Sequence, residues 1–202
     1  LSEQVDEIAW VRDLYPSARD YLDTYEAAGL LGARGLYGHA IHLTGREIDR
    51  LREVGAGLVH CPTSNTFIGS GLFDLSGLAG SGHPVGLATD TGGGSSFSML
   101  RTMAAAYEVA QLRGFAVHAA QLLWLATAGS AAVLHRGEEI GTLAPGMAAD
   151  ICVLDLASTP AIAQRAAEAD HIWEAVFPTL MMGDDRAVAS VWVNGQQLRT
   201  AN

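Results

Sequence analysis

Three short apolar runs recur along the first half of the chain, and each ends in polar residues. They cover residues 35–43, 56–65 and 85–94. Each run has the length and composition of a buried strand, and helical patterns lie between the runs and after them. Strands that alternate with helices are typical of right-handed β/α units, so the pattern predicts a parallel sheet and an α/β fold.

Helical patterns fill most of the remaining first part. We expect helices over residues 2–16, 18–28, 44–55, 72–78, 98–114 and 118–134. Ser2 is the expected N-cap of the first helix, which Pro16 should stop. Thr44 is the expected N-cap of the third helix, and Gly55 follows its last turn as a C-terminal stop signal.

The pattern changes after Arg136. Glycines and a Pro-Gly turn precede an expected strand over residues 150–156, and two more strands flank the hairpin signal Asn194-Gly195. We therefore divide the chain into residues 1–136, the C-terminal part of a (β/α)8 barrel of the TIM type, and residues 137–202, a small β module. A complete barrel needs about 250 residues, and the first part supplies three clear strands. The chain starts at Leu1 without a methionine, so we expect it to be the later part of a longer protein.

Composition and charge exclude several classes of protein. With 12 Lys+Arg against 22 Asp+Glu, the formal net charge is −10, which argues against binding nucleic-acid phosphates through bulk positive charge. Apolar residues make up 49% of the chain, as in a globular protein. We expect no membrane association, because no apolar run approaches the roughly 20 residues of a membrane-spanning helix. The two cysteines, Cys61 and Cys152, are too few for a disulfide framework, so a cytoplasmic location is expected.

Polar residues at the ends of the predicted strands are the candidates for chemistry. His39 and Asp90 follow two different strands and should face the same end of a barrel, where they could hold a water molecule or a metal ion. Each could instead have only a structural role, His39 as a buried core histidine and Asp90 as the cap of a turn. Glu3 has the position of an ordinary first-turn acid. The glycines after Asp90 should let the backbone pass close to a ligand.

Other polar residues near these strands receive weaker readings. His60 and Cys61 could suggest a Cys-His nucleophile, but neighbouring residues on a strand point to opposite faces. The roles of His42 and Asn65 stay open.

Four segments carry a resemblance to a known family. LYGHAIHL, GAGLVHCPTSN, VGLATDTGGGSSFSMLRTM and EIGTLAPGMAADICVLD occur in this order over almost the whole chain. Together they resemble the amidohydrolase superfamily and, within it, the guanine deaminase family most closely. The resemblance implies a barrel followed by a segment of a small β-sandwich domain. It also implies a homodimer.

The resemblance implies roles for three residues. Asp90 matches the aspartate that binds a single zinc ion after the last barrel strand, and His39 matches a histidine that hydrogen-bonds the substrate or the attacking water. Leu1, Ser2 and Glu3 match the last three positions of a His-x-Ser-Glu motif whose glutamate is the general acid/base. We therefore expect Glu3, His39 and Asp90 to be catalytic and to contact the substrate, with the other zinc ligands upstream of Leu1.

The implied reaction is hydrolytic deamination of guanine to xanthine and ammonia. Because most zinc ligands are expected outside the chain, we expect these 202 residues alone to be inactive. One alternative keeps the fold and changes the substrate to 8-oxoguanine, cytosine or a triazine. Another is a non-catalytic, truncated barrel that serves as an assembly module.

Overall fold

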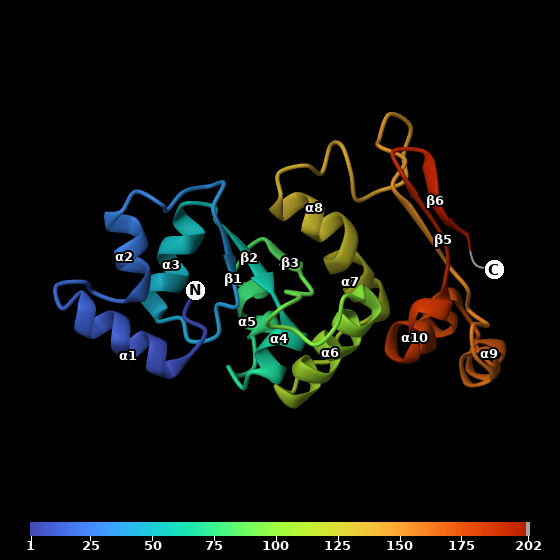
Figure 1. Cartoon of the computed structure of the whole chain (residues 1–202), viewed down its shortest axis with the longest axis horizontal. Coiled ribbons are helices and arrows are strands. Elements are labelled where there is room, and N and C mark those ends of the chain that lie inside the picture. The colour runs from blue at the N-terminus through green and yellow to red at the C-terminus, as the bar shows by residue number, and fades with distance from the viewer. Residues whose placement is uncertain (201–202) are drawn as a thin grey trace.

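The computed structural model describes residues 1–200 and contains two separate sheets (Figure 1). The first consists of β1 (Leu36–Gly38), β2 (Gly57–His60) and β3 (Val85–Leu87), in the order β1-β2-β3. Both strand pairs are parallel, with Tyr37 opposite Leu58 and Leu58 opposite Val85. The predicted parallel sheet is therefore confirmed, although its strands are shorter than the apolar runs.

Helices pack around this sheet and continue beyond it. They are α1 (Val5–Leu14), α2 (Tyr21–Ala27), α3 (Gly45–Glu53), α4 (Pro62–Phe67), α5 (Leu75–Gly80), α6 (Met99–Leu112), α7 (Ala119–Trp124), α8 (Ser130–Val133), α9 (Pro160–Ala167) and α10 (Ile172–Met182). A π-helical segment, Leu125–Gly129, joins α7 to α8, and a 3₁₀ turn, Asp185–Ala187, follows α10. Among the described residues, no helix combines the length and apolar character needed to cross a membrane.

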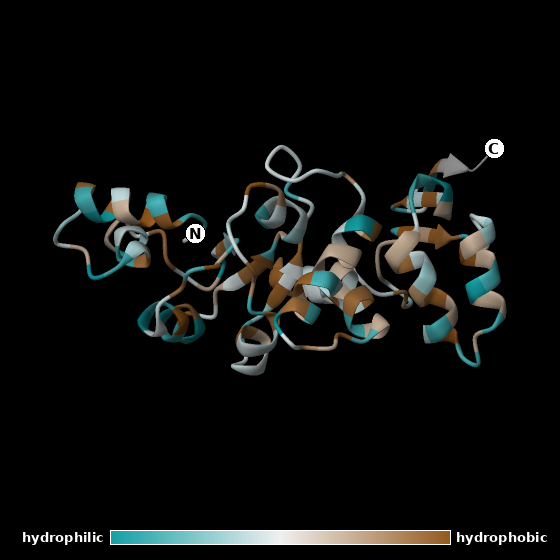
Figure 2. Ribbon diagram, turned by 90° about the horizontal axis from the view of Figure 1, so that it is seen from below, coloured by the Kyte–Doolittle hydropathy of each residue, from teal (hydrophilic) through white to brown (hydrophobic). Residues whose placement is uncertain are grey.

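The core lies where the parallel sheet meets its helices. Leu51 of α3, Leu58 of β2 and Leu122 of α7 are fully buried in one apolar cluster, together with Phe73 from the segment before α5. Apolar residues fill the middle of the ribbon accordingly (Figure 2). Burying side chains of this size stabilises the fold by about 1.5–3 kcal/mol each, and this packing holds the sheet that carries the candidate residues.

The first helix differs from its prediction. It begins at Val5, its N-cap position is Gln4, and the hydroxyl of Ser2 is buried without a hydrogen-bond partner. The residues before Val5 are not helical, because Leu1 and Ser2 form backbone hydrogen bonds with the loop after β1 and Ser2 has a φ of 49°, so Ser2 cannot act as the cap. No residue of α1 is buried, and Val5 and Trp10 are each 63% exposed, because no other element of the described chain covers that side.

The third helix begins as predicted. The Thr44 hydroxyl accepts a hydrogen bond from the Glu47 backbone, and the Glu47 carboxylate accepts one from the Thr44 backbone at 2.7 Å. The other carboxylate oxygen of Glu47 accepts the backbone N–H of Leu22 at 3.0 Å, which joins α3 to α2. This reciprocal capping box satisfies backbone donors that a helix start leaves unpaired.

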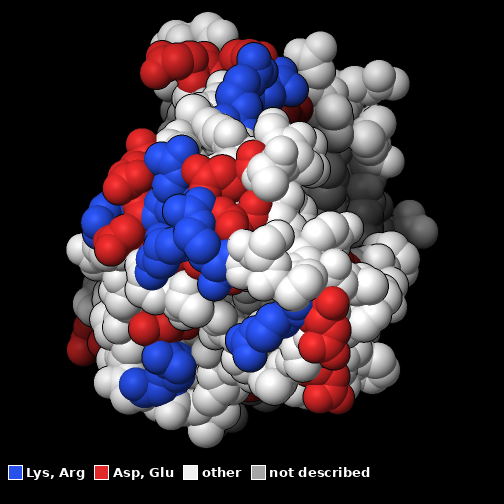
Figure 3. Space-filling view, turned by 90° about the vertical axis from the view of Figure 1, so that its left-hand side faces the viewer, with Lys and Arg blue, Asp and Glu red and all other residues white. Residues whose placement is uncertain are grey.

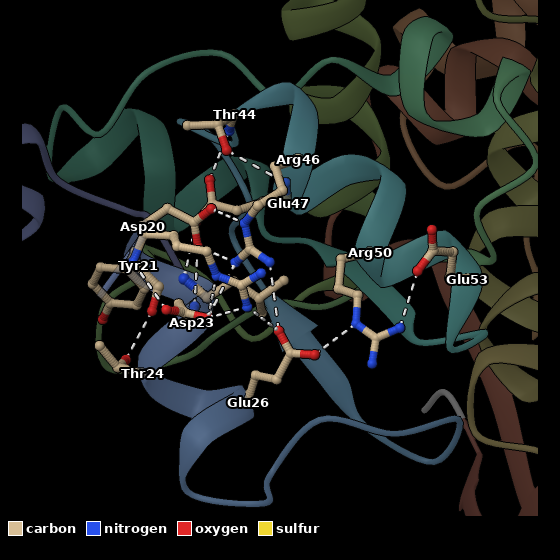
Figure 4. Close-up of polar contacts among 12 residues, drawn as sticks. Asp20, Tyr21, Asp23, Thr24, Glu26, Thr44, Arg46, Glu47, Arg50 and Glu53 are labelled. Atoms are coloured by element: carbon tan, nitrogen blue, oxygen red, sulfur yellow. Dashed lines mark hydrogen bonds and ion pairs between the residues drawn. The ribbon is translucent and has the colours of Figure 1, made fainter. Parts of the chain in front are cut away.

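Ion pairs on the outer side of α2 and α3 join the same two helices (Figure 4). Arg46 contacts Asp20, and Arg50 contacts Glu26 at 2.7 Å and Glu53 at 3.0 Å. The neighbouring Arg50 guanidinium holds the pKa of Glu26 below its ordinary value. Arginine and acidic side chains accordingly alternate over this face of the molecule (Figure 3).

The helix predicted over residues 118–134 is interrupted. The π-helical segment Leu125–Gly129 adds one residue to a turn, which places the Ser130 hydroxyl against the Leu125 carbonyl at 2.7 Å and the Leu87 backbone N–H at 3.1 Å. A side chain at Gly129 would lie 2.8 Å from the Trp124 ring. The interruption therefore fastens this helical segment to the end of β3.

The second sheet is antiparallel, with the order β4 (Ile151–Leu154), β5 (Val188–Val193) and β6 (Gln196–Thr200). Asn194 and Gly195 both have positive φ, as a tight hairpin turn requires. The three predicted strands are therefore confirmed, whereas α9 and α10 between them were not predicted. The domain division at residue 136 stays a prediction.

Candidate functional site

The structure brings Glu3, His39 and Asp90 together at the carboxyl edge of the parallel sheet. His39 follows β1, Asp90 lies three residues beyond β3, and Glu3 precedes α1. The Nδ1 atom of His39 lies 3.1 Å from Glu3 Oε1, and its Nε2 atom lies 3.8 Å from Asp90 Oδ2. One imidazole therefore stands between two carboxylates. All three side chains are partly exposed, at 22%, 18% and 37% for Glu3, His39 and Asp90, so a small molecule can reach them.

The backbone at this edge is strained and firmly held. His39, Ala40 and Asp90 have φ values of 69°, 50° and 47°, in the left-handed region that residues with side chains rarely adopt. Backbone hydrogen bonds fix the loop after β1. The Leu1 nitrogen donates to Gly38, and Ala40 donates to Leu1. Strain of this kind persists where surrounding contacts determine the conformation, and it is concentrated at functional sites.

The glycine-rich loop after Asp90 lies close to its own carboxylate. A Cβ atom at Gly93 would lie 3.2 Å from Asp90 Oδ2, and one at Gly94 would collide with the Thr89 carbonyl. The Thr63 hydroxyl also donates to that carbonyl, at 3.1 Å. The loop therefore leaves no room for side chains at these two glycines. The expected close approach of this loop to a ligand stays a prediction.

Two further polar side chains reach the cluster. Asn65 of α4 lies with its Nδ2 atom 3.0 Å from His39 Nδ1 and 3.4 Å from Glu3 Oε1. The Ser70 hydroxyl donates to the same Glu3 oxygen at 3.2 Å, and the His42 ring lies 2.9 Å from the Ser70 carbonyl. The sequence left Asn65 and His42 without a role and did not indicate Ser70. Only the observed turn of α4 brings Asn65 to the cluster.

His60 ends β2 and Cys61 follows it as the N-cap of α4, and the two side chains have different surroundings. The His60 ring is fully buried and stacks on Phe73 at 4.5 Å, and burial lowers its pKa to about 3. The Cys61 thiol lies on the side of the cluster, and burial raises its pKa to about 11. A thiol with a raised pKa carries little thiolate, so the pair does not have the character of a Cys-His nucleophile.

The donor set at this edge fits a divalent metal ion. One ligand atom each from His39, Cys61 and Asp90 lies within 4.8 Å of the other two. Imidazole nitrogen, thiolate sulfur and carboxylate oxygen are the donors that zinc takes in proteins. Asp90 supplies the carboxylate of this group, and its side chain is 37% exposed. These residues could therefore supply part of a coordination shell.

A comparison with known protein families adds to this geometry. The amidohydrolase family matches residues 1–198, which is nearly the whole chain. The chain belongs to the amidohydrolase family. A guanine deaminase from Escherichia coli strain K12 is 39% identical to this amidohydrolase over 202 residues, which are 100% of the chain and 46% of the relative. The chain thus spans about half the length of such relatives.

Solved structures confirm the mixed α/β barrel class of this amidohydrolase. The E. coli guanine deaminase superposes with a TM-score of 0.97, covering 100% of this chain and 47% of that one. A C. acetobutylicum guanine deaminase with bound guanine gives 0.88 at 26% identity, covering 98% and 47%. An adenosine deaminase from Xanthomonas campestris with bound zinc gives 0.83 at 26% identity, covering 97% and 43%.

Proposed function

We propose that the protein containing this chain removes the amino group of guanine by hydrolysis and produces xanthine and ammonia. The observation that carries the proposal is the cluster of Glu3, His39 and Asp90 at the carboxyl edge of the sheet. Barrel enzymes place their chemistry at that edge. The extensive similarity to guanine deaminases, one of them solved with guanine bound, supports guanine as the substrate.

Asp90 would hold a zinc ion, together with ligands contributed from outside the chain. Zinc supplies Lewis acidity, which makes water a competent nucleophile near neutral pH. Carboxylate oxygen is a normal zinc donor, and the absence of a side chain at Gly93 leaves the space beside Asp90 Oδ2 open. The zinc in a structurally similar deaminase supports this assignment.

Glu3 would move the protons of the reaction. Its Oε1 accepts hydrogen bonds from Ser70 and Asn65, which hold the carboxylate beside His39. In the proposed reaction Glu3 takes a proton from water and gives it to the ring nitrogen next to the attacked carbon. It then carries the proton of the hydroxyl group formed on that carbon to the amino group, which leaves as ammonia while the oxygen becomes the new carbonyl of xanthine. His39 would hydrogen-bond the reacting group from between the two carboxylates.

The test uses the complete protein. The purified, zinc-loaded protein should convert guanine to xanthine, and chromatography would measure the xanthine formed. Glu3→Gln should lower kcat by about 10²–10⁴-fold, the typical contribution of a general acid/base. Asp90→Asn should lower both activity and bound zinc, measured by elemental analysis. Glu53→Gln changes an exposed glutamate of α3 in the same way and should leave both unchanged.

Two comparisons separate this proposal from its alternatives. Faster turnover of 8-oxoguanine or cytosine than of guanine would move the assignment to another amidohydrolase substrate. The 202-residue chain alone should not deaminate guanine even with added zinc, and turnover by it would contradict the need for outside ligands. The proposal also includes a homodimer, which light scattering of the complete protein would test, and a cytoplasmic location, which cell fractionation would test.

A further inference from the structure

Ser70 presents a hydroxyl to Glu3 from a segment of backbone that is held in place. It is 4% exposed, and both of its backbone groups have partners. Its N–H donates to the Asn65 carbonyl at 2.8 Å, and its own carbonyl lies 2.9 Å from His42 Nε2. Gly71, the next residue, has a φ of 132°, a conformation that residues with side chains rarely adopt. The chain is therefore built around this turn, and the turn fixes the position of the Ser70 side chain.

Gln4 determines the direction of the Ser70 hydroxyl. Its Nε2 atom lies 3.1 Å from Ser70 Oγ and 3.4 Å from the Ile68 carbonyl oxygen. A backbone carbonyl only accepts hydrogen bonds, so the part of the Gln4 amide at this place is the NH₂ group and not the oxygen. The NH₂ group therefore donates to Ser70 as well, and the single hydroxyl proton of Ser70 is left for another acceptor.

The acceptor that receives this proton is Glu3. Its Oε1 atom lies 3.2 Å from Ser70 Oγ. A carboxyl oxygen can accept a hydrogen bond whether or not the other oxygen of the group carries a proton, so this direction does not depend on the charge of Glu3. Hydrogen bonds in a chain strengthen one another. The donation from Gln4 to Ser70 therefore supports the donation from Ser70 to Glu3.

We infer that Gln4 and Ser70 are positioning residues that together aim the Glu3 carboxylate. This inference rests on the proposed function, in which Glu3 moves protons, and it adds Gln4 to the residues on which that step depends. Gln4 occupies the N-cap position of α1, yet within the described chain its side chain makes no capping hydrogen bond to the helix. The side chain at this position is thus turned toward Ser70 instead of the start of α1.

Kinetics of the complete, zinc-loaded protein with guanine test the inference. Ser70→Ala removes the donor and should lower kcat about 10-fold with KM changed less than threefold, the effect of one hydrogen bond at a reacting group. The loss is partial because Asn65 still donates to Glu3. Gln4→Met has a similar length without the amide and should lower kcat about threefold, because it only weakens the bond from Ser70. Ser76→Ala, at an exposed serine of α5, should change neither constant.

A double-mutant cycle shows whether Ser70 acts through Glu3. In a Glu3→Ala protein the hydroxyl has no carboxylate to hold, so adding Ser70→Ala should change the remaining kcat less than about twofold. A residue with a purely structural role would lower kcat by the same factor in both backgrounds, and that result would overturn the inference. An unchanged kcat in Ser70→Ala alone would overturn it as well.

Crystal structures of the complete protein measure the carboxylate without relying on guanine turnover. In the unmodified protein Glu3 Oε1 should lie within hydrogen-bond distance of Ser70 Oγ, and in Ser70→Ala the carboxylate should turn to another orientation. If the protein does not deaminate guanine but the carboxylate turns as expected, the proposed function fails while the positioning by Ser70 stands. If it deaminates guanine and the carboxylate keeps its orientation in Ser70→Ala, only this inference fails.

Discussion

Removing the Glu47 side chain should weaken the protein more than removing any exposed glutamate on the same helix. Glu47 is 1% exposed, and its two oxygens accept the backbone N–H groups of Leu22 at 3.0 Å and Thr44 at 2.7 Å. In Glu47→Ala both donors lose their acceptor. Leu22 is fully buried, so water cannot replace the lost oxygen there, whereas Thr44 is exposed and water can replace it.

The magnitude follows from these two donors. A buried donor left unpaired costs about 1–3 kcal/mol, and the removal of a buried carboxylate returns part of its desolvation cost. Since only the Leu22 donor stays buried, we expect Glu47→Ala to lower the free energy of unfolding by about 1–3 kcal/mol. Glu47→Gln keeps one acceptor oxygen, so its free energy of unfolding should lie between those of Glu47→Ala and the unmodified protein.

The assay is equilibrium unfolding of the complete protein in urea, followed by both fluorescence and circular dichroism to test for a single transition. Glu53→Ala is the matched control, since Glu53 lies on the same helix, is 62% exposed and pairs with Arg50. Exposed ion pairs contribute about 0–1 kcal/mol, so this variant should remain close to the unmodified protein. Equal effects of the two substitutions would refute the assigned role of the capping box.

Three further expectations concern single residues. Gly94→Ala should lower guanine turnover, because its Cβ would collide with the carbonyl before Asp90, whereas Gly80→Ala, which meets nothing within 4 Å, should not. Burial lowers the pKa of His60 to about 3, and an unfolded histidine titrates near about 6.5. The unfolded chain therefore binds the proton first, and the stability this supplies above about pH 6.5 is lost as the pH falls toward 3. His60→Phe should make the urea midpoint less pH-dependent in that window, and an unchanged profile would contradict it. Iodoacetamide at pH 8 should modify the exposed Cys152 before Cys61, whose pKa burial raises to about 11, as peptide mass mapping would show.

The elements that the sequence predicts well are those whose signals are local. Thr44 followed three residues later by Glu47 is a capping box, and Asn194-Gly195 between apolar stretches is a hairpin, so both could be located without the structure. The helix α10 was missed for a local reason too. Pro178 lies inside it and reads as a helix breaker, although the flanking apolar residues hold the helix in place.

The residues of the candidate site also differ in whether a local signal in the sequence indicates them. His39 and Asp90 could be nominated because polar residues directly after parallel strands share one edge of the sheet. Glu3 gained its role only through the family resemblance, since its local pattern is that of a first-turn acid. Asn65 and Ser70 could not be assigned, because their contacts with Glu3 join residues more than 60 positions apart. That proximity depends on the packing of α4 and not on any spacing in the chain.

The pairing of residues 1–2 with the loop after β1 has a consequence for how the protein can change. Leu1 bonds to Gly38 and Ala40, and Ser2 accepts the backbone N–H of His42. Glu3 and His39 therefore lie on two segments that are joined by backbone hydrogen bonds, while Asp90 belongs to a separate loop. A displacement of either segment moves the Glu3 and His39 side chains together relative to Asp90. An inserted residue between Gly38 and His42 would shift that whole body, whereas an insertion in the exposed Pro-Gly turn near Gly146 would leave it where it is.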